Sequence, residues 1–228
     1  MRKSSPAQWG IRVSIYVLGL FCLAIGVAIS INSNLGVSPV NSMPYVVSQI
    51  SGKAMSTCVI AVFSIYILVQ MLILRRDFKP VNLLQIVFST IFGYFVDFAK
   101  WIVGDFALPG YPGRLVMLAI SIFLFALGVL LYIEVELVPM PMEGICLAIT
   151  QKLKIPFPTM KIIVDCFVVV AGMILCLVFL HGIVGIREGT VITAVVTGKV
   201  IALLKKPLSP ILQKLCFPKA KEKNTKQM

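Results

Sequence analysis

Six mostly apolar runs constrain the fold of this chain more than any other feature. They cover residues of about 12–31, 55–74, 82–103, 114–134, 160–181 and 189–204. A helix needs roughly 20 such residues to cross a bilayer core, and in lipid only a helix or a closed barrel satisfies its own backbone. Charged residues, proline and glycine occupy the breaks between the runs, as at 75–80 and 108–113. The pattern predicts an all-α polytopic membrane protein with six transmembrane helices.

The composition agrees with this class and excludes others. Of 228 residues, 59% are hydrophobic and 13% are charged, whereas a soluble domain is about half apolar and a quarter charged. This balance excludes a soluble enzyme, a disordered protein and a secreted disulfide scaffold. The six cysteines form no C-x-x-C pair, so we expect reduced thiols that pack as small hydrophobic groups. His181 is the only histidine, and we expect neither a metal site nor a cofactor.

The basic residues are sorted between the two sides that six spans would create. The net charge is +12, and with the N-terminus inside, sixteen Lys and Arg fall on the cytoplasmic side against four outside. This asymmetry predicts a cell (inner) membrane protein with both termini in the cytoplasm. We interpret the charge as topology and attraction to anionic lipids at the cytoplasmic face, and not as a nucleic-acid surface. The cytoplasmic set is Arg2, Lys3, Arg12, Arg75, Arg76, Lys79, Lys152, Lys154, Lys161, Lys205, Lys206, Lys214, Lys219, Lys221, Lys223 and Lys226, and the outer set is Lys53, Lys100, Arg114 and Arg187.

The chain after the sixth run divides into two parts. Residues 205–217 begin with two lysines and a proline, and four apolar residues follow on one side: Leu208, Ile211, Leu212 and Leu215. This pattern predicts a cytoplasmic interfacial helix held by its lysines at anionic lipid. Residues 218–228 are polar and charged, which predicts a basic disordered tail.

The two halves of the chain, residues 1–104 and 105–217, resemble each other. At an offset of 102 positions Gly26 aligns with Gly128, Leu35 with Leu137, Pro39 with Pro141 and Gln49 with Gln151, and at an offset of 105 Gly93 aligns with Gly198. Each half then has a span, a short Pro-initiated helix and two further spans. Because three spans is an odd number, the copies have opposite orientations, which is the inverted-repeat plan of many transporters. Chance identity in a low-diversity apolar sequence is the alternative.

The two short helices are predicted at residues 39–51 and 141–153. Ser38-Pro39 is a strong helix start, because serine can cap free amides and proline fits the first position. Glu143 stands in the second copy where the first has Asn41. If the helices enter the bilayer from opposite sides, their N-terminal amides form an anion-attracting end, while Glu143 favours a cation or proton. The alternative is a pair of amphipathic helices lying on the membrane surfaces.

A polar stripe runs along the third span. At about 100° per residue its members share one face of a helix: Asn82, Gln85, Ser89, Gly93, Asp97 and Lys100. The stripe must face other helices or water, because each unsatisfied polar group in lipid costs several kcal/mol. It is either a hydrogen-bonded helix seam, with Asp97 paired to Lys100, or the wall of a cavity or ion path.

Lys161 and Asp165 in the fifth span are four residues apart and can pair on one helix turn. An acid inside a span is a functional candidate by default, although a Lys–Asp pair near a helix end is often only structural. In the sixth span Thr190, Thr193 and Thr197 share a face opposite Lys199. The candidate substrate-binding or coupling residues of the whole chain are Ser38, Asn41, Gln85, Ser89, Asp97, Glu143 and Asp165.

Several segments together resemble one family. Residues 26–28 (GVA) and 34–39 (NLGVSP), Asp165, and residues 185–192 (GIREGTVI) look like the YczE-like branch of the YczE/YyaS/YitT group of bacterial multi-pass membrane proteins. The resemblance covers nearly the whole chain through short, glycine-rich motifs. It implies a helical membrane fold and a membrane location, and no particular substrate.

The sequence contains no P-loop, H-E-x-x-H or G-x-S-x-G motif, so we do not expect an enzyme. The first hypothesis is a small secondary transporter of an unknown organic solute, with proton or cation coupling through Asp97, Asp165 and Glu143. The second is a substrate-binding membrane subunit that needs an energising partner. The third is a non-transporting accessory protein of a membrane enzyme. The sequence leaves oligomerisation open.

Overall fold

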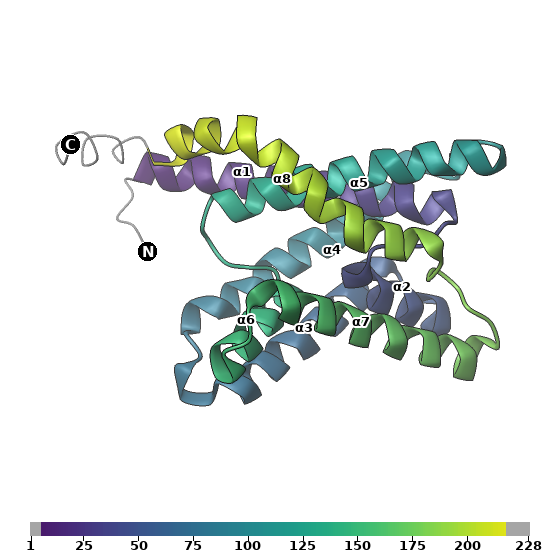
Figure 1. Ribbon diagram of the computed structural model, residues 1–228, viewed down its shortest axis with the longest axis horizontal. Helices are drawn as coiled ribbons and strands as arrows, with labels where there is room; N and C mark the ends of the chain where they lie inside the picture. Colours follow the sequence, from purple (N-terminus) through teal and green to yellow (C-terminus); the bar gives the residue numbers. More distant parts are fainter. Residues whose placement is uncertain (1–5, 218–228) are drawn as a thin grey trace.

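The computed structural model describes residues 6–217, and every regular element in that range is a helix (Figure 1). The helices are α1 (Pro6–Ser33), α2 (Pro39–Ser51), α3 (Met55–Leu74), α4 (Leu84–Val103), α5 (Gly110–Glu134), α6 (Pro141–Leu153), α7 (Phe157–Leu175) and α8 (Glu188–Cys216). Short 3₁₀ turns join α3 to α4, and a π-helical turn at Cys176–Leu180 continues α7. The predicted all-α class is confirmed. The tail predicted at 218–228 lies outside the described residues.

Five helices in the described range are long and apolar enough to cross a membrane, at 8–33, 55–77, 80–103, 110–134 and 159–180. They correspond to the first five predicted runs. The sixth run lies in α8, which carries Lys199, Lys205 and Lys206 and is the least apolar of the long helices. The chain is therefore a multi-pass helical membrane protein.

The interfacial helix predicted at 205–217 is not a separate element, because α8 continues without a break from Glu188 to Cys216. Pro207 and Pro210 lie inside it, and each removes a backbone hydrogen bond and crowds the carbonyl four residues back, which other contacts must offset. Packing holds the distal part in place: Leu212 and Cys216 are buried against the protein, whereas Ile211 and Leu215 are about half exposed. This part of α8 is thus tied to the helix bundle.

The long helices form two layers (Figure 1). In one layer α1 packs along α5, and α8 lies against α5; in the other, α3 packs against α6, and α7 against α2. Helix α4 contacts both α1 and α3 and joins the layers. Two glycines let α1 and α5 approach closely, since a Cβ on Gly19 would lie 2.9 Å from the Gly128 carbonyl oxygen. A Cβ on Gly128 would in turn lie 2.6 Å from the Gly19 carbonyl oxygen.

The short helices α2 and α6 are embedded in this bundle. In α2 the polar residues Asn41, Ser42 and Ser48 are buried, while the apolar face that a surface helix would bury is only partly covered. In α6 Met142 and Cys146 are fully buried, whereas Leu147 in the middle and Gln151 and Lys152 at the end are exposed. Burial of the polar side excludes the interpretation of α2 as an amphipathic helix on a membrane surface, because such a helix would leave that side in water.

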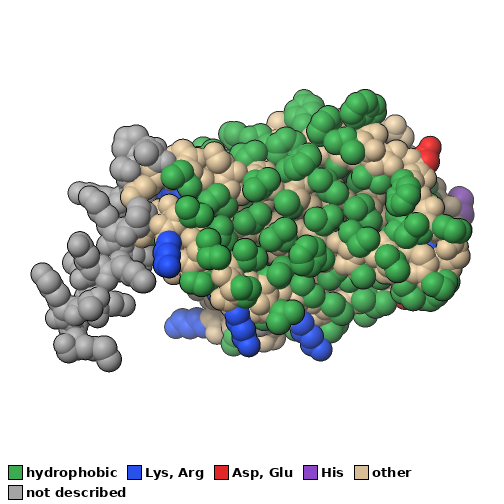
Figure 2. All heavy atoms as spheres, turned by 90° about the horizontal axis from the view of Figure 1, so that it is seen from above, with side chains coloured by type: hydrophobic (Ala, Val, Ile, Leu, Met, Phe, Trp, Pro, Cys, Tyr) green, Lys and Arg blue, Asp and Glu red, His purple; other side chains and the backbone are tan. Residues whose placement is uncertain are grey.

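The outside of the molecule is largely apolar. Figure 2 shows one face covered by hydrophobic side chains, with most of the visible Lys and Arg towards the end where α1 begins and α8 ends. Large exposed residues such as Trp101, Phe167 and Leu72 belong to the long helices, as expected for side chains that face lipid. The six cysteines are unpaired, and four of them are buried as expected of small hydrophobic groups, whereas Cys22 is partly exposed and Cys166 is exposed.

Candidate functional site

Glu143 is the third residue of α6 and the centre of the candidate site. Pro141 occupies the first position of the helix, where its missing N–H costs no hydrogen bond. The Glu143 side chain is 16% exposed. It lies close to Tyr132 of α5, and one of its oxygens, Oε2, is buried without a hydrogen-bond partner. A carboxylate is thus held inside the bundle with unused hydrogen-bonding capacity.

A pair of glutamine side chains fixes the start of α6. Gln70 of α3 donates from Nε2 to the Pro141 carbonyl oxygen at 2.9 Å and to Gln85 Oε1 at 3.0 Å. Gln85 of α4 donates back to Gln70 Oε1 at 3.3 Å. Both side chains are 1% exposed, so in this dry setting their exchange of hydrogen bonds is favourable and specific. The pair ties three helices together at the point where α6 begins.

Helix α7 brings two further charged groups to Glu143. Lys161 Nζ lies 2.7 Å from Asp165 Oδ1 on the next turn, as the spacing predicted, and 3.9 Å from Glu143 Oε1. The Lys161 and Asp165 side chains are 25% and 17% exposed. We call Glu143, Lys161 and Asp165 the carboxylate–lysine cluster. The structure therefore brings two of the predicted site residues together across α6 and α7.

The charges of the carboxylate–lysine cluster do not balance, because two carboxylates face one ammonium group. Burial raises the pKa of Glu143 above its ordinary value, and the Lys161 ammonium opposes this rise. The Tyr66 hydroxyl of α3, which also interacts with Asp165, is buried without a hydrogen-bond partner. A group of this kind can take up a proton or a small cation to neutralise its excess negative charge.

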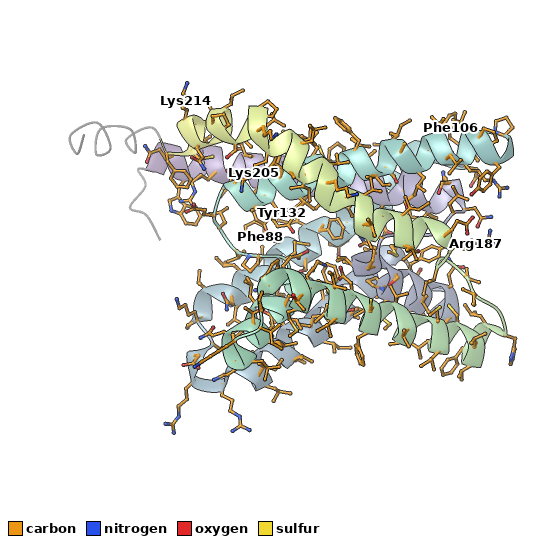
Figure 3. The ribbon with its side chains drawn as sticks, in the orientation of Figure 1. Phe88, Phe106, Tyr132, Arg187, Lys205 and Lys214 are labelled. Carbon is orange, nitrogen blue, oxygen red and sulfur yellow. The ribbon has the colours of Figure 1, made fainter. Side chains whose placement is uncertain are left out.

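Aromatic rings cover the cluster on the side of α1 and α5. The Tyr16 ring packs in a tilted arrangement against Phe88 of α4, at 4.2 Å between ring centroids, and against Tyr132, at 5.8 Å. Its hydroxyl donates to the Val138 carbonyl oxygen at 3.1 Å in the segment that leads into α6. Figure 3 shows Phe88 and Tyr132 in the middle of the molecule, between the two helix layers. These rings therefore lie between the carboxylate–lysine cluster and the layer of α1, α5 and α8.

The third-span stripe is a helix seam against α3. Asp97 Oδ1 accepts a hydrogen bond from the Ser56 backbone N–H at 3.2 Å, which satisfies one free amide at the start of α3. A Cβ on Gly93 would lie 3.1 Å from the Ser56 carbonyl oxygen, so this glycine allows the close packing. Ser89 is buried, and its hydroxyl has no hydrogen-bond partner. The structure thus places Asp97 in a helix-capping bond in place of the predicted pair with Lys100.

Ser38 and Asn41 lie together at the start of α2. The prediction that the Ser38 side chain caps the helix amides is wrong, because its hydroxyl oxygen instead accepts a hydrogen bond from Asn41 Nδ2 at 3.1 Å. The Ser38 carbonyl accepts from the Asn41 N–H at 3.0 Å. Asn41 is 2% exposed, and its Oδ1 has no hydrogen-bond partner.

Sequence reasoning missed four structural residues: Arg12, Tyr66, Gln70 and Glu134. The charge count places Arg12 on the cytoplasmic surface, yet it is 2% exposed and donates to carbonyls at the end of α5. Glu134 is 7% exposed and binds α8 through Lys205 and Ser209. A lone polar residue in an apolar run is the signal that could have identified Gln70, since such a residue needs a partner inside the bundle.

Two grooves elsewhere on the molecule are lined by apolar residues and contain no ionisable side chain. One groove is lined by Ile29, Ile102, Val103, Phe106, Leu108, Met117 and Ile120, and another by residues of α5 and α8. Neither includes a residue of the carboxylate–lysine cluster. Within residues 6–217 no group of three or more His, Cys, Asp or Glu is arranged to hold a metal ion.

Comparisons with known proteins identify the family of the chain. Residues 10–206 match the model of a family described as "Family of unknown function (DUF6198)". The "Uncharacterized membrane protein YczE" of Bacillus subtilis (strain 168) is 27% identical over 194 residues, which cover 84% of each chain. No solved structure matches.

Proposed function

The chain belongs to the DUF6198 family and is a YczE-like membrane protein, as the sequence predicted, and from that premise we propose that it is a small secondary transporter of an organic solute. The transport is coupled to a proton or a small cation. The observation that carries the proposal is the carboxylate–lysine cluster at the embedded start of α6. Ionisable groups buried in membrane helices are expensive, and they commonly mark ion and substrate pathways.

Embedded short helices support this function. Transporter sites are built where a helix is interrupted inside the membrane, so that its free N-terminal amides or flanking carbonyls meet the ligand. Both α2 and α6 begin with proline and have buried first turns. A protein with a purely structural role has no need for two such interruptions, each of which exposes backbone polar groups within the bilayer.

The packing also supports an inverted repeat, with α1 to α4 corresponding to α5 to α8. Gly19 meets Gly128, and a Cβ on Gly26 would lie 3.2 Å from the Ser121 carbonyl oxygen. At the offset of 102 positions, Gly19 corresponds to Ser121 and Gly26 corresponds to Gly128. The contact between Gly19 and Gly128 in one half of the repeat therefore corresponds to the contact between Ser121 and Gly26 in the other. The helix pairs α1–α4 and α5–α8 correspond in the same way, as do α2–α7 and α6–α3. Such a twofold relation gives a transporter two equivalent conformations with access to opposite sides.

A sixth span completes this arrangement. Helix α8 has 29 residues, or roughly 44 Å at 1.5 Å per residue, which exceeds the bilayer core. In the second half of the chain, Ser209 in the last third of α8 donates a hydrogen bond to Glu134 of α5 at 2.7 Å. In the first half, Asn32 of α1 donates a hydrogen bond to the Gly104 carbonyl oxygen after α4, also at 2.7 Å. We place both termini in the cytoplasm of a cell-membrane protein. Lys205, Lys206 and Lys214 on α8 then meet anionic lipid.

Uptake by the full chain in proteoliposomes tests the proposal. Vesicles with an imposed proton or sodium gradient are given a pool of metabolites, and mass spectrometry identifies any solute that accumulates inside. We expect accumulation that an ionophore collapses. Glu143→Gln should lose accumulation but keep downhill exchange, because the amide keeps the shape of the side chain and removes its titration.

Asp77→Asn is the matched control, because Asp77 pairs with Lys152 at the surface and is 52% exposed. It should transport like the wild type. Tight solute binding without uptake would favour a subunit that needs an energising partner. Absence of both binding and uptake would favour an accessory protein. Accumulation that Glu143→Gln leaves intact would refute the coupling role of the cluster.

A further inference from the structure

The groove between α5 and α8 is an apolar channel on the surface of the helix bundle. It has a volume of about 330 Å³. Its floor consists of Leu118 and Ile122, which are buried and pack with Leu35. Along α8 it extends over eight residues, or roughly 12 Å at 1.5 Å per residue. The side chains along its two walls are Leu115, Ala119 and Phe123 of α5 and Ile192, Val196 and Val200 of α8. The groove therefore suits a hydrocarbon chain.

Lys199 of α8 is a charged side chain beside this groove. At about 100° per residue it lies within about 60° of both Ile192 and Val196 around the helix. The residues one turn before and after it, Val195 and Leu203, are 57% and 67% exposed, and Lys199 is exposed with them. Within residues 6–217 no acidic side chain pairs with Lys199. An unpaired ammonium group on a face that meets lipid is costly unless it reaches a headgroup.

Lys206 extends the line of Lys199 towards the end of α8. It follows two turns later on the same face of the helix and is also exposed. Lys205 Nζ lies 3.5 Å from Glu134 Oε1 at the end of α5, so this part of α8 is level with that end of the bundle. In the orientation proposed above this end is cytoplasmic, and Lys199 lies roughly 10 Å further into the membrane. A lysine stem lies along apolar surface and directs its ammonium group towards the headgroups.

The two lysines have no negative charge near them on their own helix. Glu188 is the only acidic residue of α8 and precedes Lys199 by eleven residues, which is roughly 16 Å along the helix. Glu134 of α5 is bound by Lys205 and Ser209. Two ammonium groups without a counter-ion favour an anionic ligand. A zwitterionic lipid carries its own ammonium group, whereas an anionic phospholipid carries a net negative charge that matches the lysines.

We infer that the α5–α8 groove is a specific site for an anionic phospholipid of the cytoplasmic leaflet. One acyl chain fills the groove, and the phosphate accepts charge-assisted hydrogen bonds from Lys199 and Lys206. The bound lipid connects α5 and α8. The site shares no residue with the carboxylate–lysine cluster, and the inference does not depend on the transport function.

Native mass spectrometry of the full chain in detergent tests the headgroup part of the inference. Phosphatidylglycerol and phosphatidylcholine with the same acyl chains are added separately. We expect one phosphatidylglycerol molecule to remain bound and phosphatidylcholine to be lost. Lys199→Gln should weaken phosphatidylglycerol binding about fivefold to tenfold. Lys214→Gln is the matched control, because it removes the same charge from another exposed position of α8 and should bind like the wild type.

A second pair of variants tests the role of the groove. Ala119→Phe fills the groove from α5 and should abolish retention of phosphatidylglycerol. Ala194→Phe adds the same ring on the opposite side of α8 and should retain the lipid. Both alanines are exposed, so neither substitution places a ring in the core. Glycerol phosphate has the headgroup chemistry without an acyl chain, and it should not displace the lipid.

Each part of the inference has an outcome that overturns it. Equal retention of the two lipids, or retention of neither, overturns the anionic site. Equal weakening by Lys199→Gln and Lys214→Gln indicates general attraction to surface charge and also overturns it. Retention of the lipid by Ala119→Phe, or its displacement by glycerol phosphate, overturns the role of the groove. None of these outcomes changes the uptake expected of the carboxylate–lysine cluster, so the two proposals fail separately.

Discussion

Arg12 is a charged side chain used to end a neighbouring helix. Its Nε and one terminal nitrogen donate to the Val135 carbonyl oxygen at 2.9 and 2.6 Å, and the same nitrogen donates to Glu136 at 2.9 Å. Carbonyls at the end of a helix have no partner within it, and a positive charge there also matches the helix dipole. The ring of Phe217 lies 4.9 Å from the guanidinium carbon on another side. One residue thus connects α1, the end of α5 and the end of α8.

Arg12→Gln should lower the free energy of unfolding by about 2–3 kcal/mol, because it leaves buried carbonyl oxygens without donors. Thermal unfolding of the purified protein in detergent measures this. Arg76→Gln is the control, since Arg76 is exposed in the turn after α3, and it should change little. Equal effects of the two substitutions would contradict the helix-ending role.

Gly144 is small because the glutamine pair occupies the space beside it. A Cβ at this position would overlap the Gln70 carboxamide. Since that carboxamide is held by Gln85 and by the Pro141 carbonyl, it cannot move without losing its hydrogen bonds. Gly144→Ala should therefore lower the free energy of unfolding by about 1–3 kcal/mol, as measured by thermal unfolding in detergent.

A double-mutant cycle with Gln70→Ala checks the cause. If the clash with the glutamine pair is responsible, the double variant should cost clearly less than the sum of the two single variants. Gly198→Ala in α8 is a matched control, since nothing lies within 4 Å of its Cβ position, and it should be neutral or stabilising. Strict additivity would show that Gly144 is needed for another reason.

At the scale of the element, proline and periodicity predicted much of the structure. The ranges predicted for the short helices, 39–51 and 141–153, agree with α2 and α6. Whether they enter the bundle could not be predicted, because the spacing of Val40, Met43 and Val47 fits a surface helix equally well. The position of α2 inside the bundle is evident from the burial of its polar side, and this burial arises from tertiary contacts that the sequence pattern does not encode.

The ends of α2 and α6 should open to opposite sides of the membrane. In a cysteine-free background, Ser51→Cys and Gln151→Cys place single thiols at exposed positions near the two helix ends. An impermeant maleimide added to intact cells should label the first, and only disrupted cells should allow labelling of the second. Ser42→Cys, at a fully buried position, should remain unlabelled in both. Labelling of Ser51→Cys and Gln151→Cys from the same side would contradict the inverted arrangement.

At the scale of the whole molecule, hydropathy was sufficient for the all-α membrane class but not for the site. Lys161 and Asp165 were predicted to pair because they share a helix, and they do. That Glu143 joins them depends on how α6 packs beside α7, and no local pattern encodes this. The same limit explains Asp97, whose partner is a backbone amide of α3.

Coupling through Glu143 would give uptake a pH dependence with a definite sign. Burial raises the pKa of Glu143, so this carboxyl holds a proton at pH values where an exposed glutamate has lost it. If the proton is the coupling ion, initial uptake should be highest at low external pH and should fall as the pH rises through that raised pKa. Rates measured across a pH series should lose this fall in Glu143→Gln.

The most direct test of the central claim is the lumenal pH of proteoliposomes during uptake. A trapped pH-sensitive dye reports proton entry when the transported solute is added outside in sodium-free buffer. We expect lumenal acidification with wild type and with Asp77→Asn, and none with Glu143→Gln. If sodium is the coupling ion, radioactive sodium should enter with the solute in wild type and Asp77→Asn vesicles, and should not enter in Glu143→Gln vesicles. Solute accumulation with neither ion entering, or with Glu143→Gln equal to wild type, would contradict the claim that the carboxylate–lysine cluster couples transport.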